Sequence, residues 1–151
     1  MEAKHNAHLT QSSGAIRIMD LFDKLKDVKI LLIDDDEWIR DSLSLFFEFE
    51  SCAFKALETA EQGLKELEAK DYDIIILDYR LPGMNGLEFL KRIQQTHSQV
   101  IKILITAYGS KEVFSQAIEL GVHDFIDKPF STKAIEDSLS RLTEEREQKN
   151  G

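Results

Sequence analysis

Acidic residues, a hydroxyl and a lysine stand where the apolar runs of this sequence end. The residues that follow the four runs VKILLI, DIIIL, VIKILI and VHDFI are, in order, Asp34-Asp35-Asp36-Glu37, Asp78, Thr106 and Asp127-Lys128. Singly, each has an ordinary explanation, because aspartates cap helices and form turns, and most lysines are solvated surface residues. Their joint occurrence after apolar runs indicates a chemical role.

The three aspartates Asp34, Asp35 and Asp78 predict a bound divalent cation. Two carboxylates about 4 Å apart repel by ~4 kcal/mol at an effective dielectric near 20, so three of them need a counter-charge. Ligation by carboxylates and water suits Mg²⁺, which also binds phosphate groups. A carboxylate beside Mg²⁺, Lys128 and Thr106 can attack phosphorus to give an aspartyl-phosphate, and the neighbouring cations and hydroxyl would stabilise its oxygens.

The elements that must position these residues alternate between strands and helices. Apolar runs predict five strands, at 28–33, 52–57, 73–77, 100–105 and 122–126. Apolar residues at helical spacing fill the segments between them and after the last one. Local signals support these limits: a capping box at Thr59 and Gln62, a helix-ending glycine at Gly121, and a helix cap at Ser131 or Thr132.

Strands that alternate with helices predict an α/β fold with an open five-stranded parallel sheet. Right-handed connections place helices on both faces, and the strand order 2-1-3-4-5, as in flavodoxin, is expected at this size. In a parallel sheet the carboxyl ends of all strands lie along one edge. The polar residues named above are therefore expected to converge on one cleft there.

Composition limits the classes of function. The chain has 151 residues, with 42% hydrophobic and 31% charged residues, which is typical of one globular domain. No apolar run reaches the roughly 18 residues of a membrane span, and the first residues lack the apolar core of a secretion signal. The single Cys52 suits a reducing cytoplasm. The net charge of −9 argues against direct binding to nucleic acid or to an anionic membrane.

Residues 1–27 are expected to form an N-terminal extension to a domain over residues 28–147. Residues 1–13 are polar and aperiodic, which predicts a tail. Four apolar residues at helical spacing predict a short amphipathic helix that packs on the domain or on a partner: Ile18, Leu21, Phe22 and Leu25.

The sequence resembles the receiver domain of response regulators in two-component signal transduction, which has the chemotaxis-regulator-like, flavodoxin-like fold. The resemblance covers about residues 28–145 and rests on four motifs in combination: LLIDDDE at 31–37, IIILDYRLPGMNGLEFL at 74–90, ILITAYG at 103–109 and GVHDFIDKPF at 121–130. It implies that Asp78 is the phosphoacceptor. It also implies that Asp34, Asp35, Asp78 and the backbone carbonyl of Arg80 bind Mg²⁺.

The same resemblance assigns the switch residues. Thr106 corresponds to the hydroxyl that moves toward the phosphoryl group, and Phe125 to the aromatic residue that turns inward when it does. Lys128 corresponds to the phosphate-binding lysine, and its bond to Pro129 is expected to be cis. Arg80 and Tyr108 flank the phosphoryl site and are large enough to impede an attacking water.

The implied function is a switch controlled by phosphorylation in the cytoplasm. A histidine kinase or a histidine phosphotransfer protein supplies the phosphoryl group, and the chain catalyses its own phosphorylation and slow autodephosphorylation without being a conventional enzyme. The phosphorylated form then presents a changed surface, made by the fourth helix, fifth strand and fifth helix, to a downstream protein or to a second copy of the chain. The chain is either a stand-alone receiver or a piece of a longer regulator with an output domain.

Two other functions are weighed against this one. Asp34 and Asp36 form a D-x-D pattern similar to that of haloacid-dehalogenase phosphatases, which also use an aspartyl-phosphate. Glu37-Trp38 follows instead of the expected Gly-Thr type, and the chain has no room for a cap domain. A purely non-catalytic interaction domain is the third reading, and it leaves the acidic residues without a role.

Overall fold

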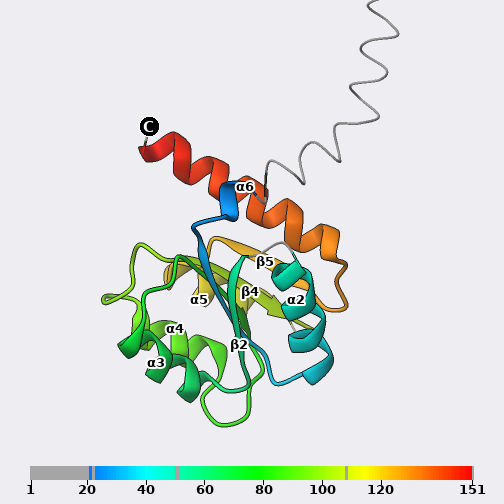
Figure 1. Ribbon diagram of the computed structural model, residues 1–151. Coiled ribbons are helices and arrows are strands. Elements are labelled where there is room, and N and C mark those ends of the chain that lie inside the picture. Colours follow the sequence, from blue (N-terminus) through cyan, green and yellow to red (C-terminus); the bar gives the residue numbers. More distant parts are fainter. Residues whose placement is uncertain (1–20, 22, 50–51, 108, 151) are drawn as a thin grey trace, which may run out of the picture.

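The computed structural model describes residues 21, 23–49, 52–107 and 109–150, and its elements alternate as predicted (Figure 1). The strands are β1 (Lys29–Ile33), β2 (Ala53–Leu57), β3 (Ile74–Asp78), β4 (Ile101–Thr106) and β5 (Asp124–Asp127). The labelled helices are α2 (Glu37–Phe49), α3 (Ala60–Ala69), α4 (Gly86–Ile93), α5 (Lys111–Glu119) and α6 (Thr132–Asn150).

The five strands form one parallel sheet in the order β2-β1-β3-β4-β5, which confirms the predicted topology. Two polar residues predicted to follow strands are instead the last residues of those strands. Asp78 pairs in register with Ile105, and Thr106 pairs with Asp127. Their backbones are thus held by the sheet itself, at its carboxyl edge.

The central strands are buried on both faces, so alternate side chains enter two separate cores. On the face covered by α2 and α6, the core holds strand residues such as Ile30 and Ile76 together with Phe47 and Leu139. On the other face, α3, α4 and α5 cover residues such as Leu77 (Figure 1). Full burial of each such side chain contributes roughly 1.5–3 kcal/mol, which makes these strands a rigid platform for the residues at their ends.

Local signals in the sequence set the helix ends. The capping box is present: Thr59 Oγ1 accepts a hydrogen bond from Gln62 N at 3.1 Å, and Gln62 Oε1 accepts one from Thr59 N at 3.1 Å. Gly121 follows Leu120, the residue that caps the C-terminus of α5, and has a φ of +90°, in the left-handed region that favours glycine. Ser131 Oγ accepts a hydrogen bond from Ala134 N at 3.3 Å, so Ser131 caps α6.

The predicted N-terminal helix packs on the domain. Residues 21 and 23–25 are helical, and Leu21 and Leu25 are buried in the core between the sheet and α6. Lys24 Nζ lies 3.6 Å from Glu147 Oε2 near the end of α6. The predicted tail, Ile18 and Phe22 lie outside the described residues. No helix in the described ranges combines the length and apolarity that a membrane crossing requires.

Candidate functional site

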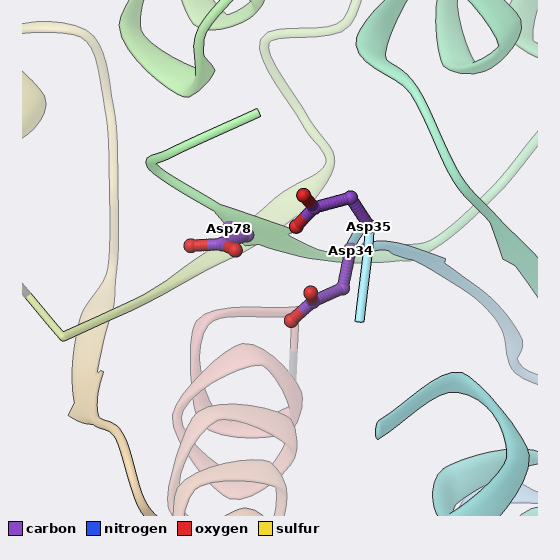
Figure 2. A group of neighbouring side chains, drawn as sticks. All are labelled: Asp34, Asp35 and Asp78. Atoms are coloured by element: carbon purple, nitrogen blue, oxygen red, sulfur yellow. The ribbon is translucent and has the colours of Figure 1, made fainter. Parts of the chain in front are cut away.

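The carboxyl edge of the sheet brings the predicted acidic residues together. Asp34 follows β1 directly, and Asp78 ends the neighbouring strand β3. One carboxylate oxygen from each of Asp34, Asp35 and Asp78 lies within 4.8 Å of the others. Figure 2 shows these three side chains gathered at the two strand ends. The convergence predicted from the sequence is therefore present in the fold.

Lys128, which follows β5, provides the positive charge at this cluster. Its Nζ lies 2.9 Å from Asp78 Oδ2, to which it donates a hydrogen bond, and 2.9 Å from Asp34 Oδ2. The contact with Asp34 is an ion pair without hydrogen-bond geometry, so among the described residues Asp34 Oδ2 is buried and accepts no hydrogen bond. This buried oxygen therefore relies on the Lys128 charge, and a bound cation would give it a second favourable contact. The donor set fits a hard cation such as Mg²⁺.

The pKa values show that burial disfavours the charged form of both carboxylates at this site. Burial raises the pKa of Asp78 to about 6, against the effect of Lys128 and with a further increase from the charge of Asp34. Burial also raises the pKa of Asp34, although the Asp36 backbone N–H and Lys128 oppose it. Burial disfavours the charged form of Lys128, but its bonds to the two carboxylates outweigh this and raise its pKa. One ammonium therefore does not compensate for the buried carboxylates, and a cation would stabilise them.

The Asp34 backbone and side chain are held on several sides. Asp34 N donates to Leu57 O at 3.0 Å, and Asp34 Oδ1 accepts from Asp36 N at 2.9 Å. Arg40 Nη1, from α2, donates to the Asp34 carbonyl at 3.0 Å. This arginine contact was not predicted from the sequence, where Arg40 is one charged residue in a helical stretch.

Asp36 has a different role from its acidic neighbours. Its Oδ1 accepts hydrogen bonds from Trp38 N at 2.9 Å and Ile39 N at 3.4 Å, which makes it the cap of α2. A carboxylate bound to the helix N-terminus is not aimed at the acidic cluster. This observation gives Asp36 a structural role and so weakens the D-x-D phosphatase reading.

The loop after Asp78 is held close to the strand end. Arg80 N donates to Asp78 Oδ1 at 3.3 Å, while the Arg80 side chain is exposed. A Cβ at Gly86 would lie 2.7 Å from the Asp78 carbonyl oxygen, so only glycine lets α4 begin this close to the acceptor strand. Glu61 Oε2 accepts from Met84 N at 3.4 Å and ties the loop to α3. The Gly86 and Glu61 contacts were also missed, and the Arg80 carbonyl as a metal ligand stays a prediction.

The predicted switch residues lie on β4 and β5. Thr106 is 1% exposed, and its carbonyl accepts a hydrogen bond from Lys128 N at 3.0 Å. Phe125 is half-buried, and its ring meets that of Phe114 on α5 edge-on, with centroids 4.8 Å apart. The Lys128–Pro129 peptide bond is cis. Tyr108, predicted to flank the phosphoryl site, lies outside the described residues.

Known proteins are similar to this chain in sequence. The family model described as response regulator receiver domain matches residues 30–140. The chain is 34% identical over 119 residues to the C4-dicarboxylate transport transcriptional regulatory protein DctD of Pseudomonas aeruginosa, covering 78% of this chain and 26% of DctD. It is 36% identical over 114 residues to the transcriptional regulatory protein ResD of Bacillus subtilis, covering 75% of this chain and 47% of ResD. The chain thus spans about a quarter to a half of the length of these curated relatives.

Solved structures agree with the sequence relatives. The crystal structure of a CheY-like response regulator receiver domain protein from Methanospirillum hungatei superimposes with a TM-score of 0.77 at 29% identity, over 81% of this chain and 98% of that one. A BeF3-activated DrrB receiver domain gives a TM-score of 0.69 at 26% identity, over 78% and 97% of the two chains. From its sheet order, the residues at the sheet edge and these matches, the chain belongs to the response regulator receiver domain family of two-component signalling.

Proposed function

We propose that this chain is a phosphorylation-controlled switch in which Asp78 accepts a phosphoryl group from a histidine kinase or a histidine phosphotransfer protein. One observation carries the proposal: the Lys128 ammonium lies 2.9 Å from oxygens of both Asp34 and Asp78 at the carboxyl edge of the sheet. A cation in contact with the Asp78 carboxylate supports the proposal that Asp78 accepts the phosphoryl group. Fixed charges of this kind favour transfer because they need no rearrangement during the reaction.

The acidic cluster would hold Mg²⁺. Asp34, Asp35 and Asp78 would supply carboxylate oxygens, and the Arg80 carbonyl is proposed as a further ligand. When bound, the ion would supply positive charge to offset these carboxylates and the oxygens of the incoming phosphoryl group. The buried Asp34 Oδ2, which accepts no hydrogen bond among the described residues, supports this role.

The transfer step uses the chain's own side chains. An Asp78 carboxylate oxygen forms a bond to phosphorus while the bond between phosphorus and the donor histidine nitrogen breaks. The leaving nitrogen keeps the electron pair of that bond, and the donor ring, protonated on its other nitrogen, departs as neutral imidazole. The Lys128 ammonium pairs with a phosphoryl oxygen, and the Thr106 hydroxyl donates a hydrogen bond to another. Hydrolysis of the aspartyl-phosphate by water then resets the switch slowly.

The switch would reach the surface through β4 and β5. Lys128 N already bonds to the Thr106 carbonyl, so the ends of these strands are joined beside the acceptor. Movement of Thr106 toward the phosphoryl group would let Phe125 change its packing against Phe114 of α5. A shift from 1:99 to 99:1 needs about 5.5 kcal/mol, which new charge-assisted hydrogen bonds can supply. The changed surface would comprise α5, β5 and α6.

The proposed partners follow from the family. Response regulator receiver domains work with histidine kinases and output domains, and the relatives named above are transcriptional regulators. We propose that the α5–β5–α6 surface binds a downstream protein, an output domain of the same polypeptide or a second copy of the chain. With a net charge of −9, this domain is not expected to bind nucleic acid directly or to associate with an anionic membrane, and a cytoplasmic location is proposed.

Phosphorylation with acetyl phosphate tests the proposal. The wild type, Asp78→Ala and the control Asp127→Ala, which removes an exposed aspartate at the same edge, are incubated with and without Mg²⁺ and resolved by phosphate-affinity electrophoresis. The wild type and the control should be labelled only with Mg²⁺, and Asp78→Ala should remain unlabelled. Equal labelling of Asp78→Ala and the wild type would exclude Asp78 as the acceptor.

A further inference from the structure

We propose that Arg40 is a positioning residue for the metal ligands: its guanidinium fixes the peptide unit that joins Asp34 to Asp35. The inference rests on the proposed Mg²⁺-dependent function of this site. Its basis is the hydrogen bond from Arg40 Nη1 to the Asp34 backbone carbonyl at 3.0 Å.

The Asp34 carbonyl needs a donor that the sheet does not supply. The register of β1 with β2 and with β3 ends at Ile33, one residue before Asp34. Asp34 is fully buried, and a buried backbone carbonyl without a hydrogen bond is strongly disfavoured. Arg40 reaches back from α2 to this carbonyl and continues the bonding of the strand beyond its last paired residue.

The same arginine belongs to the first turn of α2. Arg40 N donates to the Asp36 carbonyl at 3.0 Å, while its side chain bonds to Asp34. One residue therefore spans the whole turn between β1 and α2. This turn contains Asp34 and Asp35, two of the three members of the acidic cluster.

The peptide geometry explains why this matters for metal binding. The Asp34 carbonyl and the Asp35 N–H belong to one planar peptide unit, so fixing the carbonyl also fixes the direction of the Asp35 backbone. The Asp34 side chain has two further anchors, Asp36 N and Lys128, whereas Asp35 is exposed. Loss of the Arg40 bond should therefore disturb mainly the direction in which Asp35 presents its carboxylate.

The sign of the effect separates positioning from simple charge. A cationic guanidinium near the cluster repels Mg²⁺, so if Arg40 acted through charge alone, neutralising it would tighten binding. If Arg40 positions the ligands, neutralising it weakens binding. Arg40→Lys retains the charge but loses the planar fork and the reach of the guanidinium. If Arg40 positions the ligands, Arg40→Lys should also weaken Mg²⁺ binding. If Arg40 acts only through its charge, Arg40→Lys should leave Mg²⁺ binding unchanged.

Calorimetric titration of the full chain with MgCl₂ tests the proposal in the wild type, Arg40→Gln and Arg40→Lys. The control is Arg92→Gln, which neutralises an exposed arginine in the last turn of α4. We expect about tenfold weaker Mg²⁺ binding for Arg40→Gln, as for other residues that orient metal ligands. Arg40→Lys should be weakened severalfold, and the control should stay within about twofold of the wild type. The rise in Tm caused by Mg²⁺ should shrink in the same order.

The outcomes are distinct. If Arg40→Gln binds Mg²⁺ as tightly as the wild type or more tightly, the positioning role is wrong, whatever the stability of the variant without metal. If Arg40→Gln does not fold, the affinity of Arg40→Lys decides, with wild-type affinity overturning the proposal. If the wild type itself binds no Mg²⁺, the proposed function of the site fails and the Arg40 role fails with it.

Discussion

A buried lysine and a half-buried lysine at opposite ends of the sheet have opposite electrostatic surroundings. Lys102, near the start of β4, is 3% exposed, and its Nζ donates to the backbone carbonyls of His97 at 3.0 Å and Val100 at 3.1 Å. Burial lowers its pKa. Lys128 lies beyond the end of β5 between two carboxylates, which outweigh its burial and raise its pKa.

The difference shows that the partners of a buried cation, and not its burial, indicate its role. The carbonyls around Lys102 satisfy its hydrogen bonds but carry no full charge, so this lysine fastens the turn that precedes β4. The carboxylates around Lys128 carry more negative charge than it can compensate. The Lys128 end of the sheet, where three carboxylates converge, can therefore gain stability by taking up a further cation.

Replacement of the two lysines should give the largest contrast. Lys128→Ala removes the cation that pairs with a phosphoryl oxygen, and the rate of phosphorylation by acetyl phosphate should fall on the order of 100-fold. Lys102→Met should stay within about twofold of the wild type in the same assay. A loss of equal size in both variants would show that the contrast between the lysines is wrong.

Lys102→Met should instead lower stability. The substitution preserves most of the side-chain volume but leaves the Val100 carbonyl without the Lys102 donor, whereas the His97 carbonyl keeps its hydrogen bond from Val100 N at 3.3 Å. The free energy of unfolding in urea should fall by about 1–3 kcal/mol, the usual cost of unsatisfied buried polar groups. An unchanged urea midpoint would mean that relief from burying the charge compensates fully for the two lost hydrogen bonds.

Asp78→Asn should stabilise the metal-free protein at neutral pH. The folded pKa of Asp78 is about 6, above its unfolded value near 3.8, so its ionisation disfavours folding. The variant should exceed the wild type by about 1–3 kcal/mol above pH ~6, and the difference should vanish as the pH falls below about 4. Urea denaturation in EDTA across this range measures it, and a variant less stable than the wild type at neutral pH would contradict the excess of negative charge.

Replacement of His123, which lies at the Lys102 end of the sheet, should have the smallest effect on stability. Its Nδ1 accepts a hydrogen bond from Lys102 N at 3.0 Å. Although the residue as a whole is exposed, partial desolvation of the ring together with the Lys102 charge lowers its pKa. The folded state therefore favours the neutral ring. The stability that neutral His123 contributes is complete above the unfolded pKa of about 6.5 and is lost as the pH falls and the ring is protonated. The stability advantage of the wild type over His123→Ala, less than about 1 kcal/mol, should shrink between about pH 7.5 and pH 5. A constant advantage would refute this linkage.

The sheet and its order could be predicted because their signals are local. β-branched runs, the Thr59 capping box and the Gly121 turn each act within a few residues, and alternation of strands and helices leaves few topologies. The limits of β5 were less accurate: Val122 was assigned to the strand, but its N–H bonds to the Ala117 carbonyl at 3.0 Å. The turn that ends α5 therefore occupies the residue, and the strand starts at Asp124.

The acidic cluster could be predicted from the strand order, whereas the contacts that hold its residues in place could not. Strand ends in a parallel sheet share an edge, so Asp34 and Asp78 had to come close. The contacts of Arg40 with the Asp34 carbonyl and of Glu61 with Met84 depend on the path of two loops, which no periodicity encodes. The need for glycine at position 86 could not be predicted, because it arises from close approach to the backbone oxygen of Asp78, which belongs to a different element.

The helical turn before β1 has a practical consequence for expression work. The family match begins at residue 30 and ends at residue 140, but Leu21 and Leu25 precede this range, and Leu142 and Glu147 follow it. A fragment trimmed to those limits would uncover apolar surface that the intact chain covers, which favours aggregation. Soluble production for crystallisation should therefore begin upstream of Leu21 and retain α6 to its last turn.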